Sequence, residues 1–271
     1  MKKIIKDIIP PIFLRLLLKS SAPEAFFSFD EATRSSKNST YEQEELIDVV
    51  LKKNEIFRTL PLSNQLLNSD AVRILMAIGL ARNNNKINVI DFGGGGGNHF
   101  TIANIGFSDS VVFDWNIVET PKFVEKARKF NVPNLRYFDQ LKEAVEVLPQ
   151  IDLLLVSSTL QYCPDPIGML QQLTMTGAKY FYLTRTPFNS GAETIYSTQS
   201  SWLSKNGPGS LPAGFEDRKI SYPIGYASRS KVEEVLEARY EILFKADEGE
   251  APAFKVRGEK INMNGYFCRL R

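Results

Sequence analysis

The apolar positions in the first part of the chain recur every three or four residues, which is typical of helices that bury one face. On this spacing helices are predicted over 42–53 and 68–80, and Asn68 or Ser69 can cap the start of the second one. Residues 1–85 are therefore expected to form a helical N-terminal extension or cap.

From residue 86 onward, short apolar runs alternate with helix-like segments. The runs predict seven strands, over 87–92, 111–118, 135–138, 153–156, 180–183, 240–245 and 265–270. Helices are expected between them, over 99–105, 121–130, 141–147, 166–173 and 230–239. This alternation predicts an α/β fold in which a doubly wound, mostly parallel, seven-stranded sheet occupies a domain spanning 86–271.

Residues 186–227 interrupt the alternation, because they are rich in Ser, Gly, Pro and aromatic residues and show no clear period. A stretch of this length inside a compact domain is usually functional, so we expect an inserted lid over the substrate. Some of its side chains could stack on sugar rings or bases, or could simply pack within the lid: Tyr196, Gln199, Trp202, Tyr222 and Tyr226.

Composition narrows the classes of function. The chain has 271 residues, 43% of them hydrophobic, and 33 Lys and Arg against 31 Asp and Glu, which is ordinary globular composition without a charge that favours nucleic acid. Two cysteines and a single histidine, His99, leave too few ligands for a zinc site, so no metal is predicted. Such cysteine usage is consistent with a reducing compartment, and we expect a cytoplasmic protein.

The first 20 residues carry a net charge of +4, whereas the other residues carry −2. Their apolar run, 8–18, is interrupted by two prolines and an arginine and is too short to span a bilayer. Two interpretations remain open. Residues 1–20 could form a helix that packs on the protein's own core or on a second subunit, or a basic amphipathic segment that lies on the inner, anionic face of the membrane.

A run of five glycines follows the first predicted strand of the sheet, at the edge where open α/β sheets bind ligands. Its spacing does not fit the dinucleotide pattern G-x-G-x-x-G, and it lacks the Lys-Ser/Thr of a phosphate-binding P-loop. The pattern present is Asp91-x-Gly93-x-Gly95-x-Gly97. It resembles motif I of class I S-adenosylmethionine-dependent methyltransferases. That resemblance implies S-adenosyl-L-methionine as cofactor, with its amino-acid tail and ribose at this loop, on a Rossmann-like fold.

A ribose diol also needs a second acid, and Glu119 ends the second strand of the sheet, 22 residues after Gly97. The resemblance extends to Asp139 after the third strand, which it places at the adenine, and to Ser157 after the fourth, which it places at the methyl donor. The segments DFGGGGGNH, IVETP, LRYFDQLKEA, SSTLQYCPDP, TRTPF and SYP are similar to a family of bacterial methyltransferases often encoded near surface-polysaccharide genes.

Three residues are candidates for the chemistry. His99, at the start of the helix after the glycines, could act as a general base, position the cofactor or serve structure alone. Tyr162 could contact the acceptor or be an ordinary half-buried aromatic residue. Arg185 could bind a phosphate or carboxylate of the acceptor, or form a salt bridge. The predicted function is methyl transfer to the oxygen of a sugar or another small or polymeric acceptor. The alternative is an inactive nucleoside-binding or scaffolding protein of the same fold.

Overall fold

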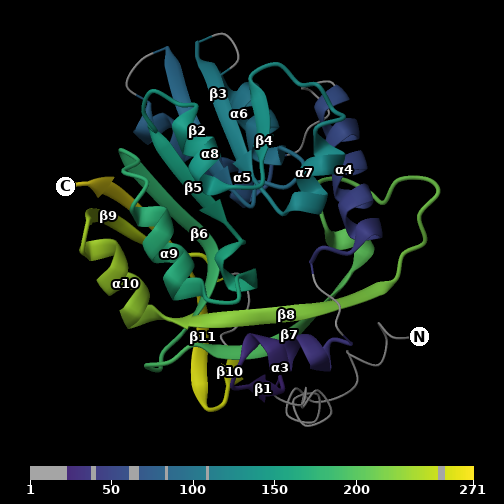
Figure 1. Cartoon of the computed structure of the whole chain (residues 1–271), viewed down its shortest axis with the longest axis vertical. Helices are drawn as coiled ribbons and strands as arrows, with labels where there is room; N and C mark the ends of the chain where they lie inside the picture. The colour runs from purple at the N-terminus through teal and green to yellow at the C-terminus, as the bar shows by residue number, and fades with distance from the viewer. Residues whose placement is uncertain (1–22, 38–40, 61–66, 83–84, 108–109, 250–253) are drawn as a thin grey trace, which may run out of the picture.

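The computed structural model describes residues 23–37, 41–60, 67–82, 85–107, 110–249 and 254–271 (Figure 1). The segment 1–20, for which a membrane or subunit contact is expected, lies outside the described residues. None of the helices in the described part of the chain is both long enough and apolar enough to cross a membrane.

A twisted sheet forms the centre of the molecule, and β2 (Lys86–Phe92) lies in its middle between two parallel neighbours, β3 (Val112–Val118) and β5 (Leu153–Ser157). Beyond β3 follows β4 (Leu135–Phe138), and beyond β5 follows β6 (Tyr180–Asn189), all parallel. The strand β11 (Glu259–Leu270) then pairs antiparallel with both β6 and β9 (Tyr240–Asp247). These seven strands are the predicted ones, and they confirm the α/β sheet.

The predicted number of strands was nevertheless too low, since the described residues form an eleven-stranded sheet. Its additional strands are β1 (Ala25–Phe26), β7 (Ile195–Trp202), β8 (Lys219–Ser228) and β10 (Phe254–Val256). β7 and β8 are antiparallel, and β8 joins the far end of β6 through two residue pairs. The stretch 186–227 is therefore largely the continuation of β6 and a long hairpin, with an irregular connection at its tip, and not an irregular insert throughout.

Helices cover both faces of the sheet, as expected for a doubly wound fold. In β5, Leu153 and Leu155 point into a core shared with α4 (Glu44–Thr59), α5 (Ser69–Ala81), α6 (Asn98–Phe107) and α7 (Pro121–Ala127). Their neighbours Leu154 and Val156 point into a second core with α8 (Leu141–Glu146), α9 (Pro166–Thr174) and α10 (Arg229–Glu237), the helices in front in Figure 1. Successive side chains of a strand alternate between the faces, so one apolar strand supplies both cores.

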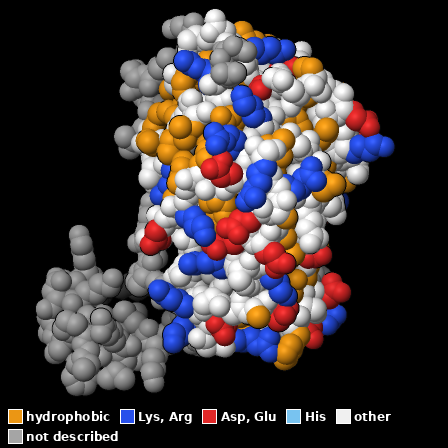
Figure 2. Space-filling view, turned by 90° about the vertical axis from the view of Figure 1, so that its left-hand side faces the viewer, with side chains coloured by type: hydrophobic (Ala, Val, Ile, Leu, Met, Phe, Trp, Pro, Cys, Tyr) orange, Lys and Arg blue, Asp and Glu red, His pale blue; other side chains and the backbone are white. Residues whose placement is uncertain are grey.

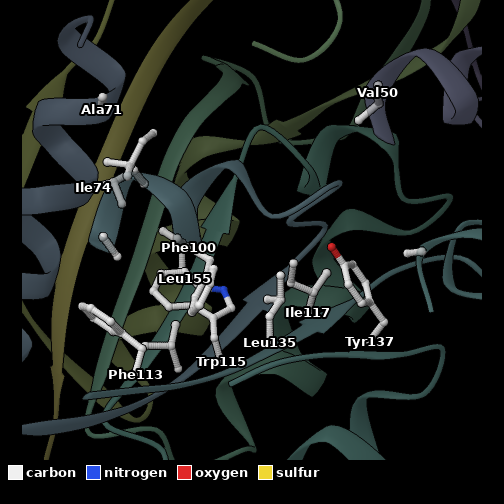
Figure 3. Packing of buried hydrophobic residues seen from close by; sticks show 14 of the residues in the cluster. Val50, Ala71, Ile74, Phe100, Phe113, Trp115, Ile117, Leu135, Tyr137 and Leu155 are labelled. Carbon is white, nitrogen blue, oxygen red and sulfur yellow. The ribbon is translucent and has the colours of Figure 1, made fainter. Parts of the chain in front are cut away.

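The first core contains a cluster of aromatic side chains from β3 and α6. Trp115 on β3 has no exposed surface, and its ring lies edge-to-face with Phe100 and Phe113, with centroids 5.9 Å away in both pairs (Figure 3). Such pairs add about 0.5–1.5 kcal/mol each beyond the area they bury. This packing holds together α6 and β3, the two elements that follow the five glycines along the chain.

The N-terminal extension packs on the long hairpin as well as on the sheet. α3 (Phe29–Ser35) lies against β7 and β8, with the Ser28 side chain as its N-cap. On α4 the buried Lys53 donates from Nζ to the carbonyl oxygens of Ser204 and Asn206, both at 2.8 Å, next to the short helix η3 (Leu203–Lys205). These bonds fasten the connection between β7 and β8 to α4.

Candidate functional site

The carboxyl ends of β2 and β5 mark the point where the order of the sheet reverses direction. The chain leaves β2 through α6 on one face and leaves β5 through α9 on the other. Ligands of open α/β sheets bind in the crevice outside such a switch point. The glycine loop, 93–97, lies there.

Three glycines of this loop require the freedom that only glycine has. Gly93, Gly95 and Gly97, the residues selected from the sequence, have φ of 71°, 55° and 86°. A residue with a Cβ atom is disfavoured in this left-handed region. The Gly93 N–H donates to the carbonyl oxygen of Val118 at 2.8 Å, so the loop is tied to the end of β3.

The two glycines between them are needed for space. A Cβ atom on Gly94 would lie 2.4 Å from Oδ2 of Asp91, and one on Gly96 would lie 2.6 Å from Nδ2 of Asn54 on α4. The five consecutive glycines therefore form a closely packed turn between β2 and α6. They are not a flexible linker.

Asp91, the acid before the glycines, is completely buried and contacts other protein groups. Its Oδ2 lies 3.0 Å from Nδ1 of His99 and accepts a hydrogen bond from Nε1 of Trp115 at 3.2 Å. An ionised carboxylate can only accept, so with Asp91 ionised this contact places a proton on Nδ1 of His99. The Nε2 atom of a neutral His99 ring is then an acceptor. Asp91 was expected to hold the cofactor, and its role in orienting His99 was not anticipated.

Glu119 projects from the end of β3 directly beside the loop. Its Oε1 accepts from the Gly95 N–H at 3.0 Å, and its Oε2 accepts from the Thr120 N–H at 3.1 Å. Burial of the carboxyl group raises its pKa to about 7, against the opposing effect of these two N–H groups, and the nearby Asp91 raises it further. Glu119 thus changes its charge near neutral pH.

The end of β5 presents Ser157 and Gln161 on the other side of the loop. Oγ of Ser157 and Oε1 of Gln161 are buried and have no hydrogen-bond partner among the described residues. Ser158 between them has φ of 56°, which is unusual for a residue with a side chain, and its Oγ accepts from Nε2 of Gln161 at 3.0 Å. Asp139, the third acid predicted here, directly follows β4 at the same edge.

Unpartnered buried polar atoms are concentrated at this edge. Within the described part of the chain seven buried side-chain nitrogen or oxygen atoms lack a partner, and five of them border the glycine loop or the end of β5. These five belong to Asn54, Arg58, Asn98, Ser157 and Gln161. Buried polar groups are nearly always hydrogen-bonded, so this concentration indicates a site for a polar ligand.

Tyr162 lies in a cluster of three tyrosines near Glu119. Its ring is stacked on Tyr41 with centroids 5.1 Å apart, and Tyr222 lies edge-to-face with both. The Tyr162 hydroxyl donates to Oε1 of Gln199 at 3.2 Å. Burial raises the pKa of Tyr41, Glu119 raises it further and Arg185 lowers it, so both charged groups lie near this tyrosine. Tyr41 was missed, because nothing in its polar surroundings in the sequence distinguishes it.

The remaining side chains proposed for the lid lie elsewhere. The Tyr196 hydroxyl donates to the carbonyl oxygen of Pro164, and Tyr226 packs edge-to-face on Phe254. Trp202 is 51% exposed. Tyr222 and Gln199 therefore join Tyr162, whereas the other three have structural contacts or face solvent.

Arg185 takes part in a charged network in the middle of β6, one residue beyond the last residue of β6 that pairs with β5. Its Nε lies 3.2 Å from Oδ2 of Asp70, and Asp70 also pairs with Arg73 at 2.6 Å. The backbone of Arg185 is left-handed, with φ of 53°, and its N–H donates to the buried carboxylate of Glu248 at 2.5 Å. The salt bridge considered as an alternative is thus present. The Arg185 side chain remains 42% exposed, so it can also reach a ligand.

No protein-family model matches the chain, and no curated protein matches it. Among solved structures, it is similar to an S-adenosylmethionine-dependent methyltransferase from Clostridium acetobutylicum (13% identity, 81% of this chain and 98% of that one, TM-score 0.44). A methyltransferase from Aquifex aeolicus gives 14% identity over 81% and 97% of the chains, with a TM-score of 0.40. The [4+2]-cyclase SpnF gives 10% identity over 92% and 98%, with a TM-score of 0.47. These TM-scores are all below 0.5. The doubly wound fold is therefore inferred from the strand order of this chain, and any function must be inferred from its site residues.

Proposed function

We propose that the protein is an S-adenosylmethionine-dependent methyltransferase that acts on an oxygen of a sugar or another small or polymeric acceptor. The observation that carries this proposal is the contact between the glycine loop after β2 and Glu119 at the end of the neighbouring strand β3, beside the switch point of the sheet. The Gly95 N–H and the Glu119 carboxylate are 3.0 Å apart, so one ligand can reach both. A carboxylate that accepts two O–H donors suits a ribose diol.

The residues at this edge offer polar groups suited to the different parts of this cofactor. Positive φ angles give the loop a tight turn, and any Cβ on Gly94 or Gly96 would meet protein atoms, so the shape of the loop is fixed. Ser157 and Gln161 offer buried, unpartnered oxygen atoms from the β5 side, and Asn54 and Asn98 offer them from the helices. When bound, S-adenosylmethionine would supply an electrophilic methyl group.

The protein's own part in such a reaction is orientation and proton transfer. His99 has its Nδ1 proton directed to Asp91, so Nε2 can take the proton of an acceptor hydroxyl. The three tyrosines and Gln199 would exclude water and position the acceptor, and Arg185 would bind an anionic group of that acceptor. A sugar acceptor is supported by the aromatic surfaces and by the sequence resemblance described above.

The proposal is tested by calorimetric titration of the protein with S-adenosylhomocysteine, with NAD and UDP-glucose as comparisons. Micromolar binding of S-adenosylhomocysteine alone is the expected result. If a folded sample binds neither it nor S-adenosylmethionine, the proposed cofactor is wrong. Binding without methyl transfer to any of a broad panel of hydroxylated acceptors would instead favour the inactive nucleoside-binding or scaffolding protein.

A further inference from the structure

One face of α4 lies along the glycine loop. Val50, Asn54 and Arg58 are spaced four residues apart and so share this face. A Cβ atom on Gly95 would lie 3.7 Å from Cγ1 of Val50, and one on Gly96 would meet Asn54. The N-terminal extension therefore forms one wall of the site, although the glycine motif belongs to the sheet.

Arg58 continues this wall next to the last glycine. The hydroxyl of Tyr137 on β4 would lie 3.4 Å from a Cβ on Gly97. Burial raises the pKa of Tyr137 to about 12, and the charge of the Arg58 guanidinium and a hydrogen bond from it act in the opposite direction. Arg58 is therefore held beside Tyr137 at the end of the loop.

The guanidinium of Arg58 is incompletely satisfied. Its Nη1 is buried without a hydrogen-bond partner, and none of the ion pairs among the described residues includes Arg58. The Arg58 residue is half-buried, but a buried nitrogen of a cationic group without a partner is costly, so an anion is expected beside Nη1. The two acids near Tyr137 are not this anion, because Asp91 contacts His99 and Trp115, and Glu119 accepts from the N–H groups of Gly95 and Thr120.

The other cations on or against α4 already have partners. Lys52 pairs with Glu55 at 2.6 Å, Lys53 donates to two carbonyl oxygens, and Lys126 pairs with Asp48 at 2.6 Å. Arg218 pairs with Glu45. Arg58 is thus the cation of this wall that can accept a new anionic partner.

We propose that Arg58 binds the carboxylate of the cofactor's amino-acid tail and makes the site selective for ligands that carry this tail. This inference rests on the proposed function and deepens it, since α4 then becomes part of the cofactor site. A guanidinium and a carboxylate form a strong charge-assisted hydrogen bond, and burial strengthens it. The adenosine part of the ligand would still be held by Glu119 and the glycine loop.

The test compares S-adenosylhomocysteine with 5′-methylthioadenosine, which has the same nucleoside but no amino-acid tail. In the full-length Arg58→Gln variant, affinity for S-adenosylhomocysteine should fall about 10- to 100-fold, the range for a hydrogen bond between charged groups. Affinity for 5′-methylthioadenosine should stay within about twofold, and this second ligand also shows that the variant is folded. Arg58→Lys should restore part of the loss, and Lys52→Gln, on the exposed face of the same helix, should change neither affinity.

Failure of this inference can be distinguished from failure of the proposed function. Equal loss of both ligands in Arg58→Gln, or loss of neither, overturns the carboxylate contact while the cofactor assignment stands. Absence of binding of both ligands to the unmodified protein overturns the proposed function itself, and the role of Arg58 with it.

Discussion

His99 Nδ1 lies 3.0 Å from Oδ2 of Asp91, a carboxylate without exposed surface. The two residues are eight positions apart and are brought together by the tight turn of five glycines between them. Asp91 therefore fixes the imidazole in one tautomer, much as the buried acid of a hydrolytic triad does. The glycine loop thus also orients the histidine that follows it.

The tautomer can be read directly, because His99 is the single histidine of the chain. In tag-free, 15N-labelled protein, long-range imidazole spectra above the titration range of the ring should show the proton on Nδ1. Asp91→Asn should remove this preference, since an amide can donate as well as accept. Trp115→Phe, which deletes the other partner of Asp91, should leave the tautomer unchanged. A proton on Nε2 in the unmodified protein would contradict the role of Asp91.

Loss of His99 should affect the chemistry more than the binding. Once an acceptor is known, His99→Ala should lower kcat about 10²- to 10⁴-fold, the contribution typical of a general base. Its affinity for S-adenosylhomocysteine should remain close to that of the unmodified protein. If cofactor affinity falls while kcat at saturation is unchanged, His99 positions the cofactor and is not the base.

Cofactor affinity should depend on pH through Glu119. Its pKa is raised to about 7, so the carboxyl group is protonated below neutrality and ionised above it. Only the ionised form accepts both ribose hydroxyls, and S-adenosylhomocysteine should therefore bind more tightly as the pH rises from 6 to 8. Glu119→Gln should bind about 10- to 100-fold more weakly at pH 8 and lose this pH dependence.

Titration calorimetry across this pH range checks the prediction. The same titrations in buffers of different ionisation enthalpy show whether Glu119 releases a proton when the ligand binds. Asp114→Asn is the matched control, since Asp114 is an acid on the same strand that pairs with Arg136 on the protein surface. An affinity of the unmodified protein that does not change between pH 6 and 8 would exclude Glu119 as the ribose ligand.

The strands of the central sheet could be predicted because apolar residues occupy their buried positions. β4 was predicted with its observed bounds, and β3 differs by one residue. β6 was predicted to end at Leu183, since Arg185 and Pro187 interrupt the apolar run, yet it continues to Asn189. In β7 the fully buried Ser197 donates to the carbonyl oxygen of Glu24 at 2.6 Å, so it is satisfied without being apolar, and the hydrophobic pattern gives no signal there.

Candidate site residues could be selected from the sequence only where they lie close to one another along the chain or at the ends of predicted strands. Asp91, the glycines and Glu119 lie close to strand ends, so local spacing was enough to select them. Tyr41 and Arg58 reach the same edge from the N-terminal extension, and only tertiary packing brings them there. Helix periodicity predicted α4 but could not indicate which loop its polar face would meet.

Replacement of Gly96 should destabilise the protein through overpacking. A methyl group there would lie 2.6 Å from Nδ2 and 2.7 Å from Cβ of Asn54, so α4 or the loop must shift. Gly96→Ala should lower the free energy of unfolding by about 1–3 kcal/mol, and it should also weaken S-adenosylhomocysteine binding. Gly79→Ala is the control, because a methyl group on this helical glycine of α5 would meet only Phe107, at 3.9 Å.

Gly79→Ala should raise the free energy of unfolding by about 0.5–1 kcal/mol, the gain from replacing glycine within a helix. Urea unfolding of both variants, with and without S-adenosylhomocysteine, separates stability from binding. If the Gly96→Ala variant is as stable as the unmodified protein, α4 does not pack tightly against the glycine loop.

The two interpretations of residues 1–20 predict different behaviour of the protein in the presence of membranes. If the segment lies on the membrane, its net charge of +4 and its apolar run should make the protein co-sediment with vesicles containing phosphatidylserine, less so at high salt, and not with neutral phosphatidylcholine vesicles. On the face of the protein in Figure 2, basic and acidic side chains are interspersed, so the described surface seen there offers no competing cationic field.

Two variants separate the interpretations of this segment. Replacement of Lys2, Lys3 and Lys6 by Gln keeps the apolar run but removes most of the charge, and it should abolish vesicle binding while leaving stability unchanged. Deletion of residues 1–20 should do the same. If the deletion instead lowers the melting temperature or converts a dimer to a monomer, and the full-length protein ignores anionic vesicles, the segment packs on the protein's own core or on a second subunit. The membrane interpretation then fails, because one apolar face cannot be buried in protein and in lipid at once.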